Sequence, residues 1–242
     1  MRTILTLSVF VCLCASLPTV GQARFHDSDI PPRNVKSFNI RDLNMIDALL
    51  QLGQEQRIPI GIEYIDAAAF RSRITMHVQD TTVGRLLDTI THGQGYSWFA
   101  NGGVIIVTHN GAPQGRKNLL NICISDFAIA RELTLQAASL QLLLKLYFAL
   151  HPRATGIAGD YPSGNPQFRV GPWTMKDAAI RQILNRIVSQ HNNGAWVVQQ
   201  APWNMDKEPD YGLWRVFEYD GNHGAKYSAL LQVWGLGLHD PE

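Results

Sequence analysis

The ionisable residues of this chain do not assemble into a known catalytic motif. The sequence contains no Gly-x-Ser-x-Gly nucleophile elbow, no His-Glu-x-x-His zinc helix, no Walker loop and no dinucleotide-binding glycine fingerprint. Its eight histidines are scattered. His92 falls at the predicted end of a helix, where a cation interacts favourably with the helix dipole. We therefore expect no catalytic residues, and a protein that is not an enzyme.

Two acidic stretches resemble metal-binding loops only in part. His26-Asp27-Ser28-Asp29 offers loose metal ligands, but it lies in the predicted N-terminal tail, where a solvated segment is expected. Asp206-Lys207-Glu208-Pro209-Asp210 has the alternating acids of a calcium loop. Its sixth position is Tyr211 instead of Gly, and its twelfth is Phe217 instead of Glu. The sequence therefore predicts no metal site and no cofactor.

A hydrolase is the rival interpretation from a different functional class. It would use the loop Arg153–Pro166, in which Asp160 lies near His151 and Arg153 in the sequence. A sensor of a small ligand is a further alternative. Neither has a motif to support it, so both rank below a non-enzymatic interaction module.

Aromatic residues are concentrated in the last third of the chain: Trp173, Trp196, Trp203, Tyr211, Trp214, Phe217 and Tyr219. Such residues commonly fill the core and pack across neighbouring strands. The functional alternative is a ligand-binding groove for a sugar or a peptide. Trp203, Tyr211 and Trp173 are then the candidate ligand-binding residues.

The region 37–109 shows alternating strand and helix patterns. Period-two and helical spacing predict the order β-α-β-β-α-β-β, with the helices on one face of small sheets, which is the α+β class. Asn44 and Thr82 are placed to cap the two helices. Asn101-Gly102, between two apolar runs, predicts a hairpin turn. Leu87 lies in the middle of the apolar stripe of the second helix.

The region 118–242 repeats much of this pattern after a Gly-containing linker at 110–117. We expect strands at Leu120–Ile124 and Phe168–Val170, helix caps at Thr134 and Thr174, and a strand at Ala195–Val198 paired with a strand containing Trp214, Val216 and Tyr219. The similarity predicts a second α+β unit and a diverged internal repeat. The alternative is one continuous sheet in which Leu120–Ile124 pairs with the first half.

The N-terminus has the pattern of a secretory signal peptide. Arg2 precedes the apolar run Ile4–Leu17, and small residues lead to a cleavage site after Ala23. The run is shorter than the roughly 20 apolar residues of a transmembrane helix. We expect a periplasmic or secreted bacterial protein with signal peptide 1–23, a tail at 24–36 and no transmembrane span in the mature chain.

Composition narrows the remaining possibilities. Of 242 residues, 45% are hydrophobic and 17% charged, which is sufficient for a packed core. A net charge of +1 gives no support to nucleic-acid binding. Cys12 and Cys14 leave with the predicted signal peptide, so Cys123 is expected to be a small buried side chain without an intramolecular disulfide.

The first half resembles the short N-terminal (STN) module of secretins and TonB-dependent receptors. The matching features are Phe38-Asn39-Ile40, Ala48-Leu49, Ile74-Thr75-Met76-His77-Val78, Thr82-Val83-Gly84-Arg85-Leu86-Leu87, Gly93-Gln94-Gly95-Tyr96-Ser97-Trp98 and Gly103-Val104-Ile105-Ile106-Val107. The second half is similar to small exported proteins of environmental bacteria. The resemblance covers about a third of the chain, residues 37–109. It implies a module that binds a periplasmic or envelope protein through an edge strand or a groove.

Overall fold

The computed structural model describes residues 33–65, 67–112, 118–150, 169–190, 194–200, 212–220 and 224–233. The fold belongs to the predicted α+β class. We call residues 33–112 unit 1. Its elements are β1 (Asn34–Leu43), α1 (Met45–Gln56), β2 (Ile60–Ile65), α2 (Ala67–Arg71), β3 (Ile74–Thr82), α3 (Val83–Thr91), β4 (Tyr96–Asn101) and β5 (Val104–His109).

Residues 118–233 form unit 2. Its elements are the 3-10 helix η3 (Leu119–Asn121), β6 (Cys123–Ile129), β7 (Leu133–Thr134), α4 (Leu135–Leu150), β8 (Arg169–Val170), β9 (Trp173–Ala179), α5 (Ile180–Ser189), β10 (Gly194–Gln200), β11 (Gly212–Asp220) and β12 (Gly224–Val233). As predicted, β10 pairs with β11. The structure shows that the pair is antiparallel, with Trp196 opposite Val216 and Val198 opposite Trp214.

One sheet contains strands of both units. It has six strands in the order β12-β11-β10-β2-β5-β4, and the two units meet where β10 pairs in parallel with β2. Unit 1 adds the two-stranded antiparallel sheet β1–β3, and unit 2 adds two such sheets, β6–β9 and the short β7–β8. A continuous sheet is the alternative that the sequence analysis leaves open. That alternative predicts that Leu120–Ile124 pairs with the first half, whereas the strand of unit 2 that pairs with unit 1 is β10.

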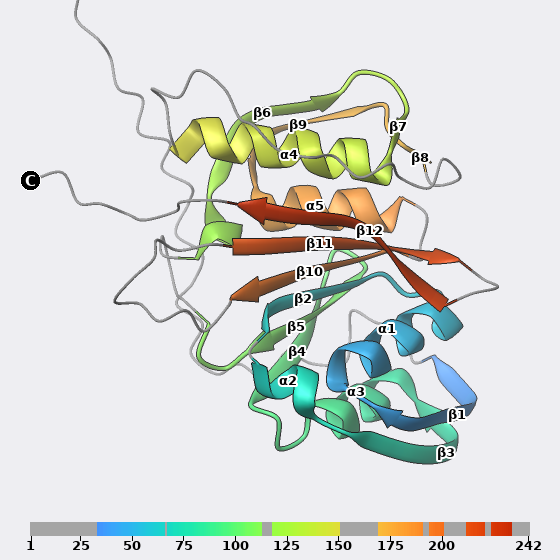
Figure 1. The fold of residues 1–242 in the computed structure, drawn as a ribbon. Coiled ribbons are helices and arrows are strands. Elements are labelled where there is room, and N and C mark those ends of the chain that lie inside the picture. Colours follow the sequence, from blue (N-terminus) through green and yellow to red (C-terminus); the bar gives the residue numbers. More distant parts are fainter. Residues whose placement is uncertain are drawn as a thin grey trace, which may run out of the picture.

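The helices of each unit cover one face of the shared sheet. Figure 1 shows α4 and α5 on one side, with β6 and β9 beyond them, and α1, α3 and the β1–β3 sheet on the other. The two cores follow the alternation of the strands. In β5, Val104 and Ile106 pack in the core of unit 2, whereas Ile105 and Val107 pack in the core of unit 1. Strand β5 is therefore buried on both faces.

Three of the four predicted helix caps are present. Asn44 Oδ1 accepts a hydrogen bond from the Asp47 backbone N–H (2.9 Å), Thr82 Oγ1 from Arg85 (3.3 Å) and Thr134 Oγ1 from Ala137 (3.2 Å). The cap predicted at Thr174 is wrong, because Thr174 lies within β9 and α5 begins only at Ile180. At the start of α5, the Gln182 side chain instead accepts a hydrogen bond from the Ala179 backbone N–H. The pairing of β9 with β6 extends the strand past the local capping signal.

Other boundaries also move. The hairpin between β4 and β5 turns at Gly102-Gly103, with φ of 60° and 80°, because Asn101 still pairs with Val104. Leu120 belongs to η3, so the first long strand of unit 2 starts at Cys123. In unit 1, β1 begins at Asn34, before the predicted boundary at Ser37.

Candidate partner-binding edge

Strand β4 is the least protected edge in the described part of the chain. Among the described edge strands longer than two residues, β4 is the one without Lys, Arg, Asp or Glu; the others are β1, β3, β6, β9 and β12. Its pairing with β5 runs from Tyr96 to Asn101 without a bulge, whereas β1 is interrupted between Ile40 and Leu43. Charges and bulges are the usual devices that prevent edge-to-edge pairing. Their absence makes β4 the candidate edge for strand addition.

The register determines which backbone groups of β4 face away from β5. Asn110 N–H donates to Gly95 C=O (2.9 Å), which makes this a hydrogen-bonded pair. Hydrogen-bonded and non-hydrogen-bonded pairs alternate along an antiparallel ladder. The backbone N–H and C=O groups of Ser97 and Phe99 therefore form the hydrogen bonds to β5. The N–H and C=O groups of Trp98 and Ala100 then point outward. They form the hydrogen-bonding row of the candidate site.

The side chain of Trp98 is fixed at this edge by helix α3. Its indole N–H donates to Asp88 Oδ1 (2.8 Å), and the indole packs half-buried against the core of unit 1. Ser97 and Asn101 are exposed, while Phe99 packs partly buried against the core of unit 2. The edge therefore presents immobilised aromatic surface beside backbone hydrogen-bonding groups.

A buried charged cluster lies nearby, at the junction of the units, and the sequence did not predict it. Glu63 of β2 is 2% exposed and forms a bidentate ion pair with Arg181 of α5; one of its bonds, Nη2 to Oε2, is 3.1 Å. Arg181 Nη1 also donates to Asn121 Oδ1 (2.7 Å). The cluster links β2 of unit 1 to α5 and η3 of unit 2, so we assign it a role in joining the two units. The sequence signal that could have predicted this cluster is Glu63 itself, an acidic residue at an inward position of an otherwise apolar strand.

Of the three predicted ligand-binding residues, the structure describes Trp173. Trp173 lies in β9, where its ring packs against Phe127 (centroids 5.5 Å apart) and its indole N–H donates to Gln190 Oε1 (3.0 Å). This agrees with the packing interpretation for that residue. Trp203 and Tyr211 lie outside the described residues, as do His151, Asp160 and the loop Arg153–Pro166.

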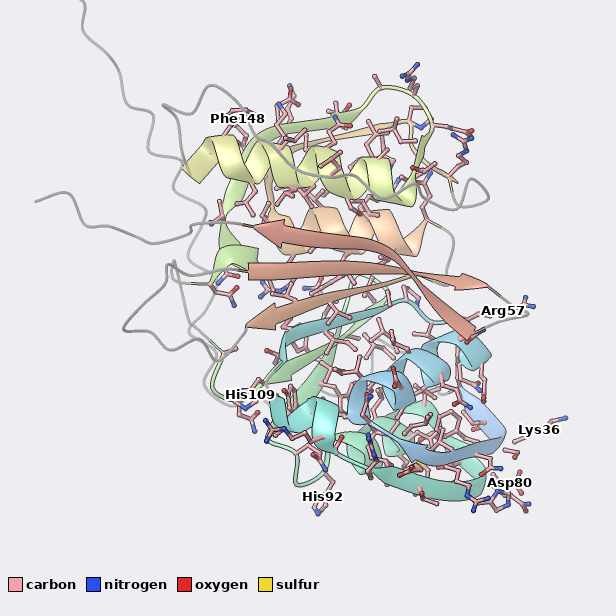
Figure 2. All side chains as sticks on the ribbon, viewed as in Figure 1. Lys36, Arg57, Asp80, His92, His109 and Phe148 are labelled. Carbon is pink, nitrogen blue, oxygen red and sulfur yellow. The ribbon has the colours of Figure 1, made fainter. Side chains whose placement is uncertain are left out.

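Histidines and acids of the described residues do not gather into a metal site. Figure 2 shows His92 projecting away from the end of α3, whereas His109 lies at the end of β5. His109 packs edge-on against Tyr96 (centroids 5.0 Å apart), and its Nδ1 accepts the Gly111 N–H (3.1 Å). In the described ranges, no helix has the length and apolar character needed to cross a membrane.

Cys123 lies in β6 and is partly buried, less deeply than the sequence predicted. Cys12 and Cys14 lie outside the described residues. The expectation that the mature chain has no intramolecular disulfide stays a prediction.

No family model matches this chain, and no curated protein shows significant similarity to it.

Proposed function

We propose that this protein is an exported, non-enzymatic interaction module of STN type, which binds a periplasmic or envelope protein by strand addition at β4. In this mode an extended segment of the partner continues the sheet, main-chain hydrogen bonds supply affinity and side-chain packing supplies specificity. The observation that carries the proposal is the uncharged, bulge-free edge of β4, with Trp98 and Ala100 offering outward backbone groups.

Two further features support it. Unit 1 contains the strands and the two helices that the sequence predicts for the region resembling STN modules, and it adds the short helix α2 between β2 and β3. The indole of Trp98 is also held in place by Asp88, so a partner would meet a preorganised surface. Preorganisation lowers the entropy that binding must otherwise overcome.

Site-specific photo-crosslinking tests the proposal. A crosslinking amino acid at exposed Ser97, on β4, is expected to capture a defined periplasmic protein, and the same group at exposed Ser125, on β6, is not. Ala100→Lys places on β4 the kind of charge that protects other edges, and it should abolish capture. Ser125→Lys adds the same charge to another edge and serves as the matched control.

The outcomes are separable. Capture at Ser97 that persists in Ala100→Lys, or that occurs equally at Ser125, would show that β4 is not the binding edge. Turnover of an ester, glycoside or peptide that is lost in Asp160→Ala would favour the hydrolase instead.

A further inference from the structure

The two units contain the same tryptophan–helix pair. Trp98 is the third residue of β4 and donates its indole N–H to Asp88, the sixth residue of α3 (2.8 Å). Trp196 is the third residue of β10 and donates to Asn185, the sixth residue of α5 (2.9 Å). Strands β4 and β10 are therefore equivalent, and each follows a helix that fixes its tryptophan.

The equivalent edge in unit 2 is already occupied. Strand β2 pairs in parallel with β10, with Ile60, Gly61 and Ile62 opposite Ala195, Trp196 and Val197. Trp196 is 1% exposed, in contrast to half-buried Trp98. The molecule thus shows which kind of strand this type of edge accepts.

Gly61 makes that pairing possible. A Cβ atom at this position would overlap the indole of Trp196 and would also lie 2.9 Å from Ile106 Cδ1. A glycine inside a strand is the usual sign of such a close approach. The apolar neighbours Ile60 and Ile62 point to the opposite face and are fully buried.

We propose that β4 accepts a parallel strand of the same kind: an extended apolar segment with a glycine opposite Trp98. This inference rests on the proposed function and specifies the partner segment. From the equivalence of the two tryptophan–helix pairs we infer that the indole of Trp98 lies across the position of the added strand, as that of Trp196 lies against Gly61 of β2. A side chain larger than glycine at the opposing position would meet the ring, which Asp88 holds in place.

A peptide from the chain itself provides the probe. A fluorescent peptide with the sequence of residues 58–65 is titrated with the mature protein, and binding is followed by anisotropy. We expect saturable binding that weakens at least about tenfold, the equivalent of about 1.4 kcal/mol, when the peptide carries Gly61→Val. In the protein, Ala100→Pro should weaken binding by a similar factor, because it removes an outward N–H without breaking a bond to β5.

The tryptophan is tested by its effect on selectivity. In Trp98→Ala the preference for the glycine peptide over the valine peptide should fall below about threefold, since the indole no longer occupies the space. A nitroxide at the N-terminus of the peptide should broaden the amide resonance of Ser97 more than that of Asn101 if the added strand is parallel to β4.

The failures of the two proposals are distinguishable. Equal binding of both peptides, or stronger broadening at Asn101, would overturn the parallel glycine strand and leave strand addition at β4 intact. Absence of peptide binding together with crosslinking from Ser97 would also overturn only this inference. Peptide binding that is unaffected by Ala100→Pro would overturn both.

Discussion

Strands β4 and β10 occupy equivalent positions in the two units but have different neighbours. Strand β10 is central in the shared sheet, between β11 and β2, and its Trp196 is buried. Strand β4 is the last strand of the same sheet, and its Trp98 is half-buried. One local arrangement, a tryptophan fixed by the preceding helix, therefore forms a packed junction in unit 2 and a candidate binding edge in unit 1.

The similarity extends to the entry into the helices. Asp80 and Asp177 each lie three residues before a helix, α3 and α5, and both have φ of 47°. Asp42 repeats the arrangement before α1, with φ of 54°. Aspartate is among the few residues that adopt this left-handed conformation readily. These shared details support the proposal that the two units are a diverged repeat.

The largest expected effect concerns the shared sheet as a whole. Trypsin should cut at Arg116 or Lys117 and yield fragments close to Arg24–Lys117 and Asn118–Glu242. Because β2 pairs with β10, we expect the nicked fragments to remain associated in non-denaturing gel filtration and to separate only in denaturant. Fragments that elute separately would show two independent domains instead.

The buried ion pair is expected to be the most sensitive side-chain contact of the junction. Arg181→Met leaves Glu63 charged and without its partner, which should reduce the free energy of unfolding by about 3–5 kcal/mol in urea denaturation. Adding Glu63→Leu removes the unpaired charge and should recover most of the loss. A double variant as unstable as Arg181→Met would contradict this explanation.

Equivalent core positions should respond alike. Leu87 in α3 and Leu184 in α5 are both at most 1% exposed and lie at the same place in their helices. Leu87→Ala and Leu184→Ala should each lower the free energy of unfolding by roughly 2–5 kcal/mol. A loss below about 1 kcal/mol for either one would place that side chain outside its core.

The smallest effect distinguishes the two tryptophans. Asn185→Leu leaves the buried Trp196 N–H without its acceptor. It should lower the free energy of unfolding by about 1–3 kcal/mol, measured by thermal unfolding. Asp88→Leu should cost less than about 1 kcal/mol, because the half-buried Trp98 N–H regains a water partner. Equal costs would show that the edge of β4 is as fully covered as that of β10.

The sequence by itself determined the local features. The strands of unit 1 with helices α1 and α3, the caps Asn44, Thr82 and Thr134, and the pairing of β11 with β10 all followed from spacing and residue type. These features depend on neighbours within a few residues or on adjacent strands, so local physics is sufficient to specify them. The five-residue helix α2 did not follow from the sequence pattern, because it is too short to show a helical period.

Tertiary structure alone decided how the two units join. The sequence left the strand order open, because the alternation of β2 and β10 shows only that both strands are buried. Glu63 and Arg181 are 118 residues apart, and the space for the Trp196 indole exists only because Gly61 lies beside it. Such contacts form between segments whose separate patterns carry no information about each other. Whether β4 lies at the edge of the sheet, and hence forms the candidate site, therefore depends on which strand of unit 1 pairs with β10.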